Sequence, residues 1–459
     1  MSDRLRSVGL DVGTTSTQMI LSELVVENKA GSFSVPEMQI GERKILYKSP
    51  VHFTPLLDES HVDGAALRKI IEREYENAGI DRRSVDTGAI IITGETSRKE
   101  NARTVLEQMA GFAGDFVMAT AGPDLESVLA AKGAGAAAYS ERTGKTVLHM
   151  DIGGGTSNLA FIRDGKIIWT GCLNVGGRLI KFDDLGKVIY RSPVLEGICS
   201  LKPGDPVTVR QMEETAEILV HALEMAAGRR EVTGLLEKLT TSEAAHLPKP
   251  DSCPENENVV ISFSGGVADC IANDIPWRSF GDMGPILGRL IRESRLCRGE
   301  YMLGEETIRA TVIGAGCHSA QLSGSTVFHR GVGFPLKNMP VVNIGAGEQT
   351  KLDSLLPEEL SKQETAAVLA LPGLAAPGYG EVVTLAEKIV RGFGENPVYV
   401  CLEQDMAKAL GQALAARLPE DRPILCIDRV KLSEGSYLDV GAPVGPALPV
   451  VVKTLVLSR

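Results

Sequence analysis

Two segments of the chain place an aspartate at the end of an apolar run and directly before a turn of small residues. The first segment reads LDVGTTSTQ from residue 10, and the second reads MDIGGGTSN from residue 150. A turn of glycine and threonine exposes backbone N–H groups and hydroxyls without side-chain obstruction, which makes an anion-binding concavity. We therefore predict that both turns bind phosphate, through Gly13, Thr14, Thr15, Gly153, Gly154, Gly155 and Thr156.

Asp11 and Asp151 are the carboxylates beside the two turns. A carboxylate next to bound phosphate can hold Mg²⁺, usually through its water molecules, and can orient the water that attacks a terminal phosphate. We predict both roles, metal binding and catalysis, for both residues. Either segment alone could be an ordinary β-turn, because Asp and Gly favour turns. The repetition of the whole pattern favours two facing turns that clamp a polyphosphate.

A third segment, residues 260–269, reads as an apolar strand that runs into a Gly-Gly turn and opens a helix. A turn without side chains lets a flat ring pack against the backbone. We predict that Gly265 and Gly266 contact the adenosine of a bound nucleotide.

Three further carboxylates could reach the same site. Glu95 follows a predicted buried strand at residues 89–93, and Asp124 and Glu126 begin a predicted helix. Helix capping and a solvated turn explain these residues almost as well. The sequence leaves open which of the three lies in the cleft.

Two other nucleotide motifs fail on inspection. Residues 143–146 resemble the end of a P-loop, but the motif requires glycine where Tyr139 stands. Residues 314–319 resemble a dinucleotide fingerprint, but no acidic residue lies between Glu306 and Glu348 to hold the ribose. We therefore expect neither site.

A metal or corrinoid site is also not expected elsewhere in the chain. Residues 59–64 resemble a cobalt-ligating motif of some corrinoid enzymes, with glutamate in place of aspartate. They precede a predicted surface helix instead of following a buried strand, so we expect His61 to be solvated. The eight cysteines contain no C-x-x-C pair, which indicates neither a zinc site nor a disulfide framework.

The elements that must position these residues begin with two β-hairpins, at residues 7–24 and 146–162. Residues 125–139 and the helix predicted at 311–322 contain few large side chains, which indicates helices that another backbone can approach closely. We also predict helices at 64–75 (capped by Asp63) and 98–109, a strand at 259–263, and one apolar helical face of Met212, Ala216, Leu219 and Leu223. Beyond residue 332, we predict strands at 340–344, 398–402, 424–428 and 450–457 and helices at 384–393 and 406–418.

Composition limits the class of protein. A chain of 459 residues with 43% hydrophobic residues is too long for one hydrophobic core, so we expect two or three domains. The net charge of -11 and the absence of a basic run argue against nucleic acid as a partner. The longest apolar stretches fall short of the ~20 residues that span a bilayer, and residues 1–6 lack the apolar core of a signal peptide. We expect a cytoplasmic protein without membrane contact.

Two phosphate motifs, an adenosine motif and two small-residue helices, in this order, resemble the actin, Hsp70 and sugar-kinase superfamily. The first hairpin is especially similar to that of Hsp70. The resemblance implies an α/β fold with two ribonuclease H-like lobes around a nucleotide cleft, ATP and Mg²⁺ as cofactors, ATPase activity, and hinge closure. On this basis we predict a first lobe at residues 1–140, a second lobe at 141–330, and an additional C-terminal α/β module at 331–459.

Several stretches resemble one family in particular, the ethanolamine ammonia-lyase reactivating factor: residues 94–101, 119–127, 149–158 and 449–455. The resemblance implies an ATP- and Mg²⁺-dependent chaperone with ethanolamine ammonia-lyase as its partner. Such a chaperone releases damaged cobalamin so that adenosylcobalamin can enter the lyase, and adenosylcobalamin is not expected as a prosthetic group of the chaperone. The family's setting suggests association with a bacterial microcompartment, although residues 1–20 contain no obvious encapsulation helix.

Two rival functions share the superfamily. A small-molecule kinase would need an acceptor pocket with a base near the terminal phosphate, and we identify no such base; a kinase would also leave the C-terminal module without a role. A filament-forming actin-like ATPase would use ATP to control assembly. The oligomeric state, a homodimer included, stays open. So do the lyase-binding surface, any direct cobalamin contact, and the role of residues 331–459.

Overall fold

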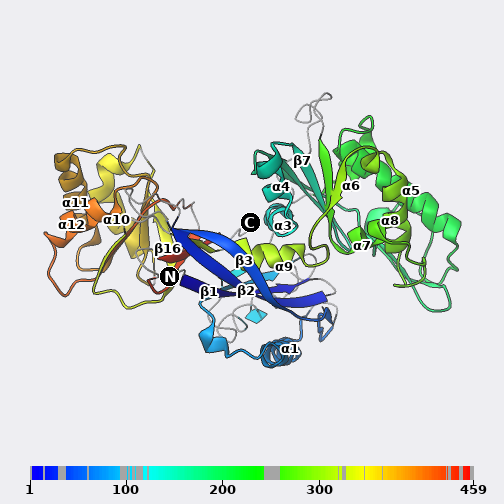
Figure 1. The fold of residues 1–459 in the computed structure, drawn as a ribbon, viewed down its shortest axis with the longest axis horizontal. Coiled ribbons are helices and arrows are strands. Elements are labelled where there is room, and N and C mark those ends of the chain that lie inside the picture. Colours follow the sequence, from blue (N-terminus) through cyan, green and yellow to red (C-terminus); the bar gives the residue numbers. More distant parts are fainter. Residues whose placement is uncertain are drawn as a thin grey trace.

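The computed structural model of the chain is a mixed α/β protein with three large sheets (Figure 1). The structure describes residues 3–13, 16–28, 38–58, 61–93, 101, 104–105, 109, 117–120, 123–241, 259–318, 320–322, 327–345, 347–363, 365–430, 432, 436–443 and 448–454. Figure 1 shows the first sheet in the middle, with the second sheet on one side and the third sheet on the other.

The first sheet has the strand order β3-β2-β1-β5-β6, with β4 beside β2. β1, β2 and β3 are antiparallel neighbours, whereas β5 and β6 run parallel to β1. The predicted hairpin and the buried strand are confirmed as β1–β2 and β5. The strands are β1 (Asp3–Val12), β2 (Ser16–Asn28), β3 (Met38–Lys48), β4 (His52–Phe53), β5 (Thr87–Ile92) and β6 (Val117–Thr120).

Helix α1 (Gly64–Asn77) covers one face of the first sheet. It begins where predicted, because the Asp63 side chain accepts a hydrogen bond from the backbone N–H of Ala66. Its buried residues Leu67 and Ile71 lie one helical turn apart and pack against the apolar side chains of β1 and β5. A short 3₁₀ helix, η1 (Arg82–Ser84), follows it.

The second sheet repeats the first in order and direction. Its order is β9-β8-β7-β12-β13, with β7, β8 and β9 antiparallel and with β12 and β13 parallel to β7. The repeat confirms the internal duplication and the actin-like arrangement of two ribonuclease H-like sheets. The strands are β7 (Val147–Ile152), β8 (Ser157–Arg163), β9 (Lys166–Leu173), β12 (Val260–Ser264) and β13 (Tyr301–Leu303).

Further helices and a small two-stranded sheet surround the second sheet and share its hydrophobic core. The predicted apolar face is confirmed, because Met212, Ala216, Leu219 and Leu223 are fully buried on one side of α5. These elements are α5 (Val209–Ala226), α6 (Gly234–Leu239), α7 (Gly266–Ala272), α8 (Gly284–Glu293), β10 (Ile180–Phe182), β11 (Val188–Arg191), η3 (Pro193–Leu195) and η5 (Arg295–Cys297).

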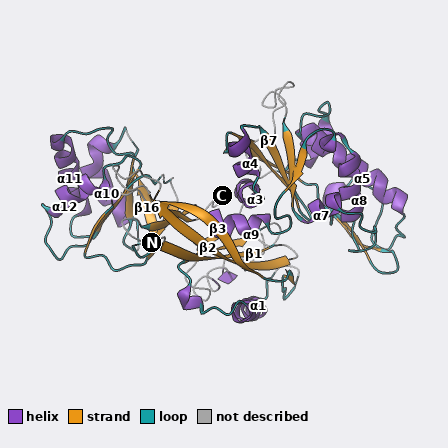
Figure 2. Ribbon diagram, in the orientation of Figure 1, coloured by secondary structure: helices purple, strands orange, loops and turns teal. Residues whose placement is uncertain are grey.

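The third sheet has the order β14-β21-β20-β16-β17-β18-β19-β15. Strands β16 to β19 are parallel and alternate with three helices, which lie together on the side away from the first sheet (Figure 2). The strands are β14 (Ala320–Leu322), β15 (Phe328–Arg330), β16 (Leu336–Asn343), β17 (Val368–Leu371), β18 (Val398–Leu402), β19 (Ile424–Ile427), β20 (Ser436–Val440) and β21 (Pro449–Thr454). The helices are η6 (Gln349–Lys351), α10 (Leu352–Ser361), α11 (Tyr379–Phe393) and α12 (Ala407–Ala415).

The third sheet includes β14 and β15, which precede residue 331. Strands on both sides of the predicted limit at residue 330 thus pair in one sheet. Division of the chain into domains at residues 140 and 330 stays a prediction.

Two helices with small side chains join the first and second sheets: α3 (Pro123–Gly133) and α9 (Ala310–His318). α3 packs on β8 and β9, α9 packs on β1 and β2, and the two helices contact each other. A Cβ atom on Gly133 would lie 1.9 Å from the Ala310 carbonyl oxygen, and one on Gly314 would lie 2.1 Å from the Leu129 carbonyl oxygen. The predicted close approach of backbones is therefore confirmed.

Two predicted helix limits were wrong. The segment predicted as one helix at 125–139 is two helices, α3 and α4 (Ala136–Thr143), because Gly135 adopts a left-handed conformation with φ +79°. The helix predicted at 311–322 ends at His318, and the chain then forms strand β14, which pairs with β21. Most of the helix predicted at 98–109 lies outside the described residues.

None of the helices in the described part of the chain combines the length and apolar character that crossing a bilayer requires.

Gly314→Ala should destabilise the protein, because its methyl group would overlap the Leu129 carbonyl. Overpacking of this kind costs about 1–3 kcal/mol of unfolding free energy. The matched control is Gly380→Ala in α11, where a Cβ meets no atom within 4 Å and where alanine should stabilise the helix by roughly 0.5–1 kcal/mol. Thermal unfolding measures both. Equal melting temperatures for Gly314→Ala and the unmodified protein would contradict the backbone contact.

Candidate functional site

Asp11 and Asp151 lie near the ends of β1 and β7 and face the N-terminal half of α9. A Cβ on Gly9 would lie 2.5 Å from the Val312 carbonyl oxygen of α9, and residues two apart on a strand share a face, so Asp11 points to the same side. The Thr311 hydroxyl of α9 lies 3.5 Å from Asp151 Oδ2. The two carboxylates thus approach one helix from two different sheets.

Asp151 is buried and held by a chain of hydrogen bonds. Ser264 Oγ donates to Asp151 Oδ1 at 2.5 Å, and His149 places its two ring nitrogens 2.9 Å from Ser264 Oγ and 3.0 Å from Ser262 Oγ. Burial lowers the pKa of His149 to about 3, so its ring is neutral. Because the Ser264 proton goes to an ionised Asp151, Ser264 accepts from His149 Nε2–H, and Ser262 donates to His149 Nδ1.

Both carboxyl groups are harder to ionise than in water. Burial raises the pKa of Asp151 to about 6, against hydrogen bonds from Ser264 and Thr311 that lower it. Burial raises the pKa of Asp11 to about 7, helped by the nearby charge of Asp151 and opposed by the Thr93 hydroxyl, which donates to Asp11 Oδ1 at 2.9 Å. A bound cation would compensate the charge that the fold places here.

The two predicted phosphate turns begin with the same backbone hydrogen bond. The Gly13 N–H donates to the Ser16 carbonyl at 2.9 Å, and the Gly153 N–H donates to the Thr156 carbonyl at 2.9 Å. Thr14 and Thr15 lie outside the described residues. The structure therefore brings Gly13 and Gly153 to equivalent positions beside the two aspartates.

The second turn is braced on its carbonyl side. The Gly177 N–H donates to the Gly153 carbonyl at 3.0 Å, and the Arg178 N–H donates to the Gly154 carbonyl at 2.7 Å. In a planar trans peptide the N–H points opposite to the carbonyl, so the N–H groups of Gly154 and Gly155 point away from this brace. A Cβ on Gly155 would meet no atom within 4 Å, so no neighbouring atom crowds the side-chain position of this residue.

The predicted adenosine turn lies next to the second hairpin, because Ser264 is the register partner of Asp151. Gly265 has φ +83°, and a Cβ there would lie 2.3 Å from the Ile152 carbonyl oxygen. Gly266 opens α7, and its nearest neighbour for a Cβ is Ile308 Cδ1 at 4.0 Å. The fold itself therefore needs Gly265, whereas the position of Gly266 is open.

The three carboxylates that the sequence left undecided differ in their positions and partners. Glu126, in the first turn of α3, is buried and accepts a hydrogen bond from Asn158 Nδ2 at 2.8 Å, which brings it to the second hairpin. Asp124 instead accepts from the Thr170 hydroxyl of β9 at 2.5 Å. Glu95 lies outside the described residues. Glu126 is thus the one of the two described candidates that is linked to the strand opposite Asp151.

The oxygen atoms at the site suit Mg²⁺. In the described part of the chain, no three or more His, Cys, Asp or Glu side chains form a group that could hold a metal ion. Mg²⁺ is usually held by one or two carboxylates together with phosphates and water, not by a protein cage. Asp11 and Asp151 fit this pattern. His61, by contrast, bonds Asp58 in a surface loop, in agreement with a solvated side chain.

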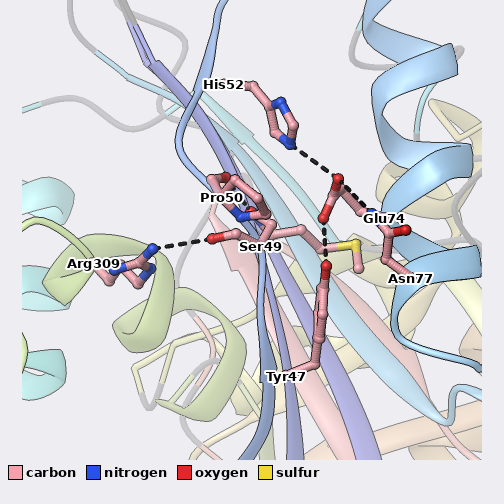
Figure 3. A network of polar contacts seen from close by, with 8 residues as sticks. Tyr47, Ser49, Pro50, His52, Glu74, Asn77 and Arg309 are labelled. Carbon is pink, nitrogen blue, oxygen red and sulfur yellow. Dashed lines mark hydrogen bonds and ion pairs between the residues drawn. The ribbon is translucent and has the colours of Figure 1, made fainter.

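One short segment connects the first turn to the rest of the site. The Thr54 hydroxyl donates to the Gly13 carbonyl at 2.7 Å. Figure 3 shows a second contact, in which the Arg309 guanidinium, directly before α9, donates to the Ser49 carbonyl at 3.0 Å. The segment at residues 47–54 therefore contacts both the turn at Gly13 and the start of α9.

The same segment is anchored on α1 through the buried carboxylate of Glu74. Tyr47 Oη donates to Glu74 Oε2 at 2.6 Å, His52 Nε2 lies 3.0 Å from Glu74 Oε1, and Asn77 Nδ2 donates to Glu74 Oε1 at 3.2 Å (Figure 3). These contacts hold residues 47–54 against α1.

Sequence reasoning missed the side chains that hold the two carboxylates: Thr93, His149, Ser264 and Thr311. His149 and Ser264 stand two residues before Asp151 and one before Gly265, so inspection of the motif flanks could have found them. Thr93 and Thr311 reach the site only through the sheet and helix packing.

Comparison with known proteins gives one family. The family model for "Ethanolamine utilisation protein EutA" matches residues 3–458. Ethanolamine ammonia-lyase reactivase EutA of Salmonella typhimurium is 40% identical over 471 residues, which cover 98% of this chain and 98% of that protein. The protein of the same name from Escherichia coli is 38% identical over 481 residues, with the same coverage of 98% and 98%.

Solved structures with a similar arrangement are more distant. A Ppx/GppA family member from Aquifex aeolicus superposes with a TM-score of 0.41 at 13% identity, covering 68% of this chain and 97% of that chain. Ethanolamine utilization protein EutJ from Carboxydothermus hydrogenoformans superposes with a TM-score of 0.32 at 15% identity, covering 68% and 88%.

Asp11→Asn should stabilise the nucleotide-free protein at alkaline pH. A carboxyl group whose pKa is raised by folding favours the folded state at low pH and loses that contribution as pH rises through about 7. We expect a melting temperature about 2–4 °C higher at pH 8, the change that roughly 1 kcal/mol makes in a domain of 150–250 residues, and a smaller gain at pH 5.

Asp81→Asn is the matched control for that measurement. The backbone N–H of Arg83 holds the pKa of Asp81 below its usual value, so this substitution should not raise the melting temperature. A lower melting temperature for Asp11→Asn at pH 8 would show that the ionised Asp11 carboxylate does not destabilise the folded protein.

Proposed function

The chain belongs to the EutA family of ethanolamine utilisation proteins, and we propose that it reactivates ethanolamine ammonia-lyase. The observation that supports this most is the match to two reactivases at 40% and 38% identity over 98% of each protein. The matched residues, 3–458 in the family model, include the three sheets and every described part of the candidate site.

The proposed cofactor is ATP, bound between the two hairpins. The outward N–H groups of Gly154 and Gly155 and the matching turn at Gly13 are suited to the phosphates. The open position of Gly266 leaves room for the adenosine to pack against the start of α7. Thr14, Thr15, Gly153, Thr156 and Gly265 complete the proposed nucleotide contacts.

Asp11 and Asp151 are proposed to hold Mg²⁺ through its water molecules and to orient the water that attacks the terminal phosphate. The cation, when bound, neutralises charge on the phosphates. The residues of this chain fix the carboxylates beforehand, since Thr93 and Ser264 each donate a hydrogen bond to one of them. Preset orientation is what positioning of an attacking water requires.

Hydrolysis would change the ligand that both lobes contact, and so shift the balance between open and closed cleft. Only a ligand with different affinity for the two states can do so. The α3–α9 contact and the segment at residues 47–54 connect the site to both lobes. In this proposal the closed or open state grips the lyase and releases damaged cobalamin, so that adenosylcobalamin can replace it. Location at a bacterial microcompartment stays a prediction of the family resemblance.

Reactivation is the test of the proposed function. Ethanolamine ammonia-lyase inactivated with cyanocobalamin is mixed with this protein, Mg²⁺ and adenosylcobalamin, with and without ATP, and ethanolamine deamination is followed. We expect recovery only with ATP. Asp151→Asn should hydrolyse ATP at least ~100-fold more slowly, the usual contribution of a positioned acid–base group, and should restore no activity. Equal recovery with and without ATP would reject the ATP-dependent cycle.

Gly266→Val should weaken ADP binding at least ~10-fold, because the branched side chain fills the space assigned to the adenosine, while the melting temperature without nucleotide changes little. Gly234→Val is the matched control, since Gly234 also opens a helix and its Cβ would meet no atom within 4 Å. Titration calorimetry with ADP compares the two. Unchanged affinity in Gly266→Val would reject the adenosine assignment.

A further inference from the structure

Two buried amide side chains occupy equivalent positions in the two hairpins. Gln18 on β2 is the register partner of Asp11, and Asn158 on β8 is the register partner of Asp151. Directly opposed residues of antiparallel strands lie on the same face of the sheet. Gln18 is 3% exposed and Asn158 is 4% exposed, so each amide is enclosed beside a carboxylate of the site.

Each amide donates through its nitrogen, whereas its oxygen has no partner among the described residues. Gln18 Nε2 donates to the Ile308 carbonyl at 3.3 Å, and Asn158 Nδ2 donates to Glu126 Oε2 at 2.8 Å. Within the described part of the chain, Gln18 Oε1 and Asn158 Oδ1 have no hydrogen-bond partner although both atoms are buried. These contacts fix the orientation of each amide, because an exchange of its nitrogen and oxygen would set an oxygen against another acceptor.

A buried acceptor without a hydrogen bond is unfavourable and rare in folded proteins. Here the same omission occurs twice, at matching positions of two repeated hairpins and next to both carboxylates. Chance packing is a poor explanation for two unbonded oxygens at matching positions. The repetition indicates a common partner that binds between the hairpins.

We propose that Gln18 Oε1 and Asn158 Oδ1 accept hydrogen bonds from water molecules that surround the divalent cation of the nucleotide site. The proposal rests on the proposed function and extends it to two further residues. Mg²⁺ keeps several water ligands, and each such water needs acceptors on its outer side. Two carboxylates and two amide oxygens, one of each from either lobe, supply them.

Replacement of the oxygens tests the proposal with Mn²⁺ as the probe. Binding of Mn²⁺ in the presence of saturating ADP is measured by the loss of the free-Mn²⁺ EPR signal. Gln18→Met and Asn158→Leu each remove an amide with little change in side-chain size. The cation polarises its bound water, so the hydrogen bond from that water to the amide oxygen is stronger than one between neutral groups. Each variant should therefore bind Mn²⁺ about tenfold or more weakly. The double variant should be weaker still.

Asn101→Leu is the matched control. Asn101 is bonded through both amide groups, with Oδ1 accepting from the Val62 N–H at 2.9 Å and Nδ2 donating to the Val62 carbonyl at 2.8 Å. Its loss should lower the melting temperature and leave Mn²⁺ affinity unchanged. Asn158→Leu also loses a hydrogen bond, from Nδ2 to Glu126, so its melting temperature should fall as well, and the fall in Mn²⁺ affinity is what distinguishes it from the control.

The outcomes separate the two proposals. If the unmodified chain binds no Mn²⁺ with ADP, the nucleotide site itself is wrong and this inference falls with it. If the unmodified chain binds Mn²⁺ with ADP and both single variants bind it equally well, only the role of the amide oxygens is wrong. Gln18 and Asn158 lie on separate hairpins, so one variant remains informative if the other does not fold.

Discussion

The direct backbone contact between α3 and α9 is the constraint on which the site depends. Each helix packs on a different sheet, and the absence of side chains at Gly133 and Gly314 sets how closely the two sheets approach. Because Asp11 and Asp151 both face α9, this contact also determines the separation of the two carboxylates. A larger residue at the crossing would move one lobe, and with it one half of the site.

The close approach has an electrostatic consequence. Burial takes both carboxyl groups out of water and raises the pKa of each, to about 7 for Asp11 and about 6 for Asp151, and the charge of Asp151 adds to the rise at Asp11. Hydroxyl groups donate to both carboxylates: Thr93 to Asp11, and Ser264 and Thr311 to Asp151. A site built in this way favours a cationic ligand, and binding of that ligand favours the approach of the lobes.

Local patterns in the sequence predict the hairpins, the small-residue helices and the cap at Asp63, because these features depend on neighbouring residues. The resemblance to the actin, Hsp70 and sugar-kinase superfamily implies the repeated sheet. The break at Gly135 and the strand after His318 escape prediction, since one depends on a left-handed backbone and the other on pairing with β21. The donor Thr93 and the tie from Thr54 to Gly13 join distant parts of the chain, which periodicity and motifs do not reveal. The roles of Asp11, Asp151 and the glycines at the turns stay proposals that the geometry supports.

Titration of the unmodified protein with ATP in a calorimeter, with and without Mg²⁺, tests most directly that the two hairpins form a single cation-dependent nucleotide site. We predict one ATP bound per chain and a much higher affinity with Mg²⁺ than with a chelator. Absence of binding, or binding of equal affinity with and without the cation, would contradict it.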